Sequence, residues 1–324
     1  MVQVREIHAT SLADPGDIEA WLDKIAQKCQ LDKPARESLG EAADLARKAE
    51  ESAQLAGESV FRGSILQMGL EIADILSDLR MDCEGLQAAI LYRAVREGKL
   101  DLDVVRNDFG ERVATLINHV LRMAVISGLC NDSRQNVFGQ DAGQQAGKVR
   151  EMLVSLIDDV RVALIKLAER TCAIRMVKTA PEQKRREVSR EIFDVYAPLA
   201  DRLGIGQLKW ELEDLAFRYL EPDEYQQIAR LLDEKRLNRQ RYIDSAIATI
   251  KAELDKINKH AEVTGRAKHI YSIWRKMHRK DIGFSQVYDI RAIRVLVPTI
   301  SDCYAVLGIV HSKWRNIPNE FDDY

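Results

Sequence analysis

The residues of this sequence best suited to chemistry form a cluster of cations in the segment GRAKHIYSIWRKMHRK, residues 265–280. On a helix from His269 to Lys280, the i, i+3 and i+4 spacing separates an apolar side from a polar side. The apolar side carries Ile270, Ile273, Trp274 and Met277, and the polar side carries Ser272, Arg275, Lys276 and Arg279. Arg and Lys side chains at a helix entry are typical of a site for phosphate groups. The alternative is a solvated basic helix face, which is common in soluble proteins.

Carboxylates follow the cations at two places. Asp289 begins a β-branched segment that also contains Arg294. A carboxylate at a strand end, across from a cationic helix, suits Mg²⁺ held against phosphate oxygens, although a capping or salt-bridge role is the alternative. A second group, Glu320, Asp322 and Asp323, lies in the tetrapeptide EFDD. Three carboxylates so close repel one another unless a cation is near, and the alternative is an exposed acidic turn.

The elements that must position these residues change in type along the chain. From about Pro15 to Lys259 apolar residues recur at helical spacing, so this part is predicted to be mostly α-helical. Predicted helices include 64–79, 154–177 and 236–260, with a break at Gly204 and Gly206, a stop at residues 221–223 and a loop over 131–146. Strands are then predicted at 261–264 and 290–297, the second an interior strand, and a further helix at 302–313. The fold class is therefore a mostly α N-terminal domain followed by the start of an α/β domain.

Composition limits the class of protein. The 324 residues are 46% hydrophobic and 31% charged, with a net charge of −3, which indicates a soluble globular protein of at least two domains. A net charge of −3 produces no positive electrostatic potential that would attract nucleic acid, so direct DNA binding is not expected. No apolar run is long enough for a signal peptide or a membrane span. The five cysteines contain no C-x-x-C pair, which favours reduced thiols and a cytoplasmic location.

Four segments resemble the RelA/SpoT homologue family in the family's order. They are VALIKLAER (162–170), YAPLADRLGI (196–205), GRAKHIYSIWRKM (265–277) and CYAVLGIVH (303–311). The resemblance implies a degenerate HD-type helical domain over residues 1–200 and a helical linker over 201–260. The N-terminal part of a nucleotidyltransferase-like (p)ppGpp synthetase domain would then occupy residues 261–324.

The resemblance also implies a reaction, in which the β,γ-pyrophosphate of ATP moves to the 3′-hydroxyl of GTP or GDP with Mg²⁺. Carried over by motif, the ATP-binding residues would be Arg266, Lys268, Ser272, Lys276 and Arg279, with Arg266 near the adenine. Asp289 would hold the metal and Arg294 would add a phosphate contact. The acidic residues Glu320, Asp322 and Asp323 resemble the synthetase-only branch, in which they are expected to tune metal use and substrate choice.

A second expectation concerns the family's hydrolase site, where a His, a His-Asp doublet and a later Asp hold Mn²⁺. The corresponding positions here are Met68, Tyr92, Arg93 and Glu169, and the sequence contains no His-Asp dipeptide. Tyr and Met are poor substitutes for imidazole and carboxylate ligands, and Arg repels a divalent cation. We therefore predict that this domain folds, binds no Mn²⁺ and hydrolyses nothing, which disfavours a bifunctional alarmone hydrolase.

The resemblance finally implies segments beyond residue 324. These would be a guanine-stacking Tyr, a second metal-binding Glu, and C-terminal domains that sense ribosomes carrying uncharged tRNA. We expect the 324-residue polypeptide to be a fragment with little or no synthetase activity of its own. The alternative is a catalytically silent regulatory or interaction module.

Overall fold

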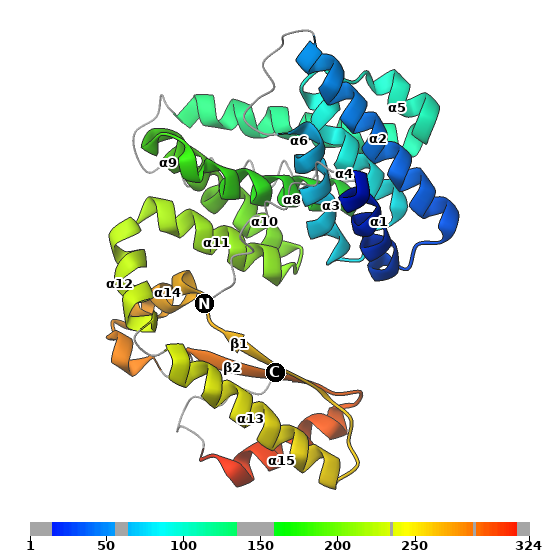
Figure 1. Ribbon diagram of the computed structural model, residues 1–324. Coiled ribbons are helices and arrows are strands. Elements are labelled where there is room, and N and C mark those ends of the chain that lie inside the picture. The colour runs from blue at the N-terminus through cyan, green and yellow to red at the C-terminus, as the bar shows by residue number, and fades with distance from the viewer. Residues whose placement is uncertain (1–14, 56–63, 135–158, 234–235, 288–289, 316–324) are drawn as a thin grey trace. The chain divides into compact units, whose positions relative to one another are not determined.

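The computed structural model describes residues 15–55, 64–134, 159–233, 236–287 and 290–315 (Figure 1). Contacts divide the chain into two compact units, with the boundary between Leu220 and Glu221. We call the part up to Leu220 the helical unit and the part from Glu221 the mixed unit.

The helical unit consists, within its described residues, almost entirely of helices. The α-helices are α1 (Pro15–Cys29), α2 (Lys33–Leu55), α3 (Ile65–Ser77), α4 (Cys83–Arg96), α5 (Leu102–Phe109), α6 (Glu111–Arg134), α8 (Val160–Met176), α9 (Glu182–Glu191), α10 (Ala197–Arg202) and α11 (Gly206–Leu220). A 3₁₀ turn follows α8 at Val177–Thr179, and a π-helical turn at Ile192–Tyr196 joins α9 to α10. The prediction of a mostly α N-terminal part is confirmed.

The core of the helical unit is centred on α3 and α4. Almost the whole circumference of both helices is buried, which matches their apolar sequences. The two backbones approach closely at Gly69, because a Cβ atom there would lie 2.4 Å from the carbonyl oxygen of Ile90. Side chains start both helices: Ser64 Oγ accepts from the Gln67 N–H at 3.1 Å, and Asp82 Oδ1 accepts from the Gly85 N–H at 3.1 Å.

Most helix boundaries in this unit agree with the sequence. The break before α11 is confirmed, because Gly204 has a φ of +73°, a conformation that glycine adopts without strain. One prediction is wrong in part: residues 131–134, expected in a loop, form the end of α6. The rest of that loop, 135–146, and the start of the helix predicted from residue 154 lie outside the described residues.

The mixed unit combines helices with a small sheet, as the sequence predicted. Its elements are α12 (Pro222–Asp233), α13 (Arg236–Lys256), β1 (Glu262–Ala267), α14 (Ile270–Lys280), a 3₁₀ turn (Phe284–Gln286), β2 (Arg291–Leu296) and α15 (Ile300–Lys313). The stop predicted at 221–223 is confirmed, because α11 ends at Leu220. Pro222, within that stop, begins α12, where its missing N–H costs nothing. Helix α13 ends at Lys256, four residues before the predicted end at residue 260.

The two strands pair antiparallel, from Glu262 opposite Leu296 to Ala267 opposite Arg291. One face of this sheet packs on α13 and α15 through a cluster that includes Leu254, Val263 and Val306. Burial along β2 alternates between half-buried and exposed residues, and Leu296 is 44% exposed. The prediction of an interior strand is therefore wrong for the described residues, because β2 has β1 as its strand partner and helices on one face alone.

Candidate functional site

Helix α14 carries the predicted cations, and its two sides are separated as the sequence indicated. The apolar side packs on α12 through a cluster centred on the fully buried Ile273, with Ile228 and Leu232 of α12 opposite it. Trp274 and Met277 flank this cluster. The polar side lies at the surface: Arg275 and Arg279 are exposed, and Ser272 and Lys276 are half-buried. The structure thus orients the cationic side away from the core of the mixed unit.

The segment before α14 runs directly from strand to helix. The Lys268 N–H donates to the carbonyl oxygen of Ile290 at 3.0 Å, which extends the pairing of the two strands by one step. In the register of the sheet, Arg266 is paired with Ala292 and Arg294 with Thr264, so the two arginine positions are close neighbours across the strands. Arg294 is exposed. The direction of the Arg266 side chain lies outside the described part of the structure.

A close backbone approach holds β1 against α13. A Cβ atom at Gly265 would lie 2.2 Å from Cγ2 of Ile243 and 3.2 Å from Cδ1 of Ile247. Real Cβ atoms do not come this close to a neighbour, so glycine allows the strand to lie on the helix. The Gly265 of the predicted motif is therefore explained by packing against α13.

The structure describes neither the carboxylate predicted to bind the metal nor those predicted to tune its use. Asp289, Glu320, Asp322 and Asp323 all lie outside the described residues. The structure accordingly brings Arg266, Lys268, Ser272, Lys276, Arg279 and Arg294 into one strand–helix–strand unit. The placement of a carboxylate opposite these cations stays a prediction.

Sequence reasoning missed one contact of α14. The indole Nε1–H of Trp274 donates to Oε2 of Glu224, in the first turn of α12. The same oxygen lies 3.6 Å from Nε2 of His278, one helical turn beyond the tryptophan. The rings of Trp274 and His278 are in contact, with centroids 4.4 Å apart. The sequence shows an acid near a helix start, but nothing local indicates that it would meet a residue fifty positions away.

The helical unit contains the four positions at which the hydrolase ligands of the resembling family would lie. Met68 on α3 is 8% exposed and Tyr92 on α4 is fully buried. Arg93 forms an ion pair with Glu97, one turn later on the same helix. Burial, with the charge of Glu169 as a second cause, raises the pKa of Tyr92 to about 12. A neutral phenol, a thioether and a paired guanidinium are poor ligands for a hard divalent cation.

Glu169, the fourth position, is 1% exposed and surrounded by cations. Arg170 binds both of its carboxylate oxygens at 2.7 Å, Lys166 Nζ lies 3.0 Å from Oε2, and Arg96 Nη1 lies 2.8 Å from Oε1. Burial opposes ionisation of Glu169, but the charges of Arg170, Lys166 and Arg96 overcome it and hold its pKa well below the usual range. Burial and the charge of Arg170 lower the pKa of Lys166 to about 8. Protein cations thus neutralise the one carboxylate among the four positions.

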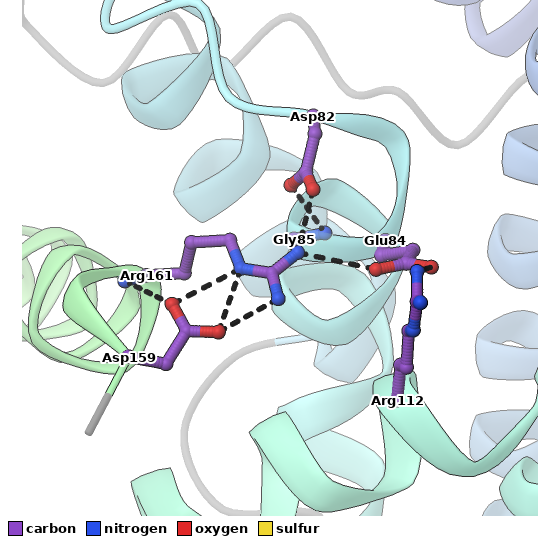
Figure 2. A network of polar contacts seen from close by, with 6 residues as sticks. All are labelled: Asp82, Glu84, Gly85, Arg112, Asp159 and Arg161. Atoms are coloured by element: carbon purple, nitrogen blue, oxygen red, sulfur yellow. Dashed lines mark hydrogen bonds and ion pairs between the residues drawn. The ribbon is translucent and has the colours of Figure 1, made fainter. Parts of the chain in front are cut away.

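A second polar network fixes α4 and α8, the helices that carry Tyr92 and Glu169. Figure 2 shows the guanidinium of Arg161 between Asp159 on one side and Asp82 and Glu84 on the other. Its Nη2 donates to Asp159 at 2.7 Å and its Nη1 to Glu84 at 3.1 Å. Asp159 also caps α8, and Asp82 caps α4, so one arginine joins the starts of both helices. Its carboxylate partners, Asp159 first, raise the pKa of Arg161 above its ordinary value.

Two absences apply to the described residues. They contain no group of three or more His, Cys, Asp or Glu side chains placed to hold a metal ion. Among the same residues, no helix is long and apolar enough to cross a membrane.

Comparison with known families gives two matches. Residues 42–206 match the HD domain, and residues 265–324 match the region found in RelA / SpoT proteins. The first match covers the helices that hold the Glu169 cluster, and the second begins at Gly265.

Curated relatives are named GTP pyrophosphokinase. The relative from Escherichia coli (strain K12) is 47% identical over 260 residues, which are 80% of this chain and 34% of the relative. That from Photobacterium angustum is 42% identical over 324 residues, all of this chain and 42% of the relative. That from Haemophilus influenzae is 40% identical over 328 residues, again 42% of the relative. The chain spans between 34% and 42% of the length of these proteins.

Proposed function

Because the chain belongs to the RelA/SpoT family, we propose that it is part of a GTP pyrophosphokinase, which transfers the β,γ-pyrophosphate of ATP to the 3′-hydroxyl of GTP or GDP. The product, (p)ppGpp, would serve the stringent response in the cytoplasm. The proposal is supported by the names of the relatives, which are 40–47% identical over most of the chain. We propose that segments of the relatives beyond the region matched by this chain contact the ribosome and uncharged tRNA.

The observation that carries this proposal is the cationic side of α14. Lys276, which is half-buried, and Arg279, which is exposed, lie about one turn apart on this side of α14. Transfer of a phosphoryl or pyrophosphoryl group depends mainly on positioning and on neutralising charge at the phosphate oxygens. A helix with its apolar side anchored and its cations on the opposite side supports both requirements.

Each residue has a proposed role in this reaction. Arg266 and Lys268 bind ATP, with Arg266 near the adenine, and Ser272, Lys276 and Arg279 bind its phosphates. Arg294 adds a further phosphate contact from β2. Asp289 is the proposed ligand of Mg²⁺, and Glu320, Asp322 and Asp323 tune metal use and the choice of nucleotide. Oxygen ligands of this kind suit Mg²⁺, which would neutralise charge on the transferred group.

We further propose that the HD domain of this chain is not a hydrolase. Three of the four ligand positions hold Met68, Tyr92 and Arg93, and the fourth, Glu169, already has three cationic partners. A metal at Glu169 would have to displace those cations or lie beside them, and both cost free energy. The domain then has a structural or regulatory role.

Titration with a non-hydrolysable ATP analogue and Mg²⁺ tests the proposal. The 324-residue chain is expected to bind the analogue, and Arg279→Ala to weaken binding about tenfold, since a charge-assisted hydrogen bond contributes roughly 1.5–3 kcal/mol. Lys251→Ala, which removes an exposed cation from α13, is the matched control and should leave the affinity unchanged. No binding by the unaltered chain, or equal losses in the two variants, would refute the assignment of α14 as the ATP site.

A further inference from the structure

Helix α14 is held to α12 by two kinds of contact. The apolar contact joins Ile273 to Ile228 and Leu232. The polar contact joins the carboxylate of Glu224 to the indole N–H of Trp274, with the imidazole of His278 3.6 Å from the same oxygen. Trp274 also stacks on Tyr271, with ring centroids 5.7 Å apart. The aromatic side of α14 therefore meets a single carboxylate at one end of α12.

The two contacts constrain the helix differently. Apolar packing is non-directional, so by itself it permits small rotations and shifts of α14. A hydrogen bond to an indole N–H is directional and weakens steeply when its geometry changes. Trp274 and His278 are four residues apart and hence lie on one face in successive turns. Contact with both constrains the rotation of the helix and its position along its own axis.

That orientation decides where the cations point. Successive residues of an α-helix are rotated by about 100°, so a shift in register by one residue would move the cationic side through more than a quarter turn. Lys276 follows Trp274 by two residues and Arg279 follows His278 by one. The direction of both cations is therefore tied to the two residues that Glu224 contacts.

We propose that Glu224 is a positioning residue for nucleotide binding: it holds Trp274 and His278 so that the cations of α14 face the phosphates of ATP. This inference rests on the proposed function for the ligand, although the contact itself does not. Glu224, on α12, is not a catalytic residue, because it contacts the aromatic side of α14 rather than the cationic side. It acts through the orientation of α14.

The test compares Glu224→Ala with Glu224→Gln in the 324-residue chain. The alanine variant loses the acceptor and should bind the ATP analogue about tenfold more weakly. The glutamine variant keeps an acceptor oxygen for the indole N–H and should recover most of that loss. Asp223→Ala, at the preceding exposed position of α12, is the matched control and should bind like the unaltered chain.

A double-variant cycle separates positioning from general destabilisation. Trp274→Phe removes the other partner of the same hydrogen bond, so adding it to Glu224→Ala should weaken binding no further. Urea unfolding of each variant establishes that it is folded at the temperature of the titration. Independent, additive losses from the two changes, or an unaltered affinity in folded Glu224→Ala, would overturn the proposal.

Hydrogen exchange supplies a readout that needs no nucleotide. Amide exchange across residues 270–280 should accelerate in Glu224→Ala and stay unchanged in Asp223→Ala. If the unaltered chain binds no ATP analogue but exchange is faster in Glu224→Ala, the structural role of Glu224 is supported and the proposed function is rejected. Unchanged exchange in Glu224→Ala would reject the positioning role, whatever the nucleotide affinity.

Discussion

Replacement of Glu169 by Gln tests the claim that protein cations, rather than a metal ion, neutralise this buried carboxylate in the HD domain. Glu169 is 1% exposed and binds Arg96, Lys166 and Arg170 at distances of 2.7–3.0 Å. The substitution keeps the shape of the side chain but removes the central negative charge. Lys166 then loses its ion pair with residue 169, and Arg170 retains Glu191 at 3.4 Å.

The expected cost is large because charge is left uncompensated in the interior. Removing one partner of a buried ion pair typically destabilises a protein by about 3–5 kcal/mol. For a unit of this size that corresponds to a fall in Tm of roughly 10 °C. Glu169→Gln combined with Lys166→Met removes a cation as well, and it should recover part of the loss. Glu182→Gln, at an exposed position of α9, should change the Tm by less than about 2 °C.

The pH dependence of stability tests the same claim, because the lowered pKa of Glu169 fixes the direction of the effect. The folded-state pKa of Glu169 lies below its unfolded value, so its contribution is present above about pH 4.3 and is lost as pH falls through the folded pKa. The part of the stability difference between the unaltered chain and Glu169→Gln that comes from the Glu169 charge should thus shrink in acid. Urea unfolding from pH 7 to pH 3 measures it. Equal stability of the two proteins at pH 7 would refute the claim that the Glu169 cluster is a stabilising ion cluster.

Three shorter predictions concern packing and metal binding. Gly265→Ala places a methyl group against Ile243 and should destabilise the mixed unit by about 1–3 kcal/mol in urea unfolding, with partial rescue by Ile243→Ala. Additive effects of those two changes would contradict the packing argument. Arg161→Met should lower the free energy of unfolding of the helical unit by about 1–3 kcal/mol in urea, because Asp82, Glu84 and Asp159 lose a shared partner. A loss of stability seen only at low salt would instead indicate a weaker surface ion pair. Millimolar Mn²⁺ should leave the Tm of the chain unchanged, and a concentration-dependent rise would reveal a site.

Features that depend on neighbours in sequence were predicted well. The two sides of α14 follow from helical periodicity, the start of α3 follows from Ser64, and the end of α11 follows from the stop at residues 221–223. The replacement of the HD ligands at Met68, Tyr92, Arg93 and Glu169 stays a prediction that rests on residue types. By contrast, the interior position expected for residues 290–297 was wrong, since β-branched residues on both sides of a strand do not determine how many elements cover it.

The sequence by itself determined which side of α14 is cationic and that the chain contains no His-Asp dipeptide, because both are matters of residue type and local spacing. Only the tertiary structure decided the partners of Glu224 and the contact of Glu169 with Arg96. The Trp274 indole is 50 residues from Glu224, and Arg96 is 73 residues from Glu169. Such pairs form where packed helices bring distant charges within a few ångströms, and the angle and register of that packing depend on the whole core rather than on any one segment.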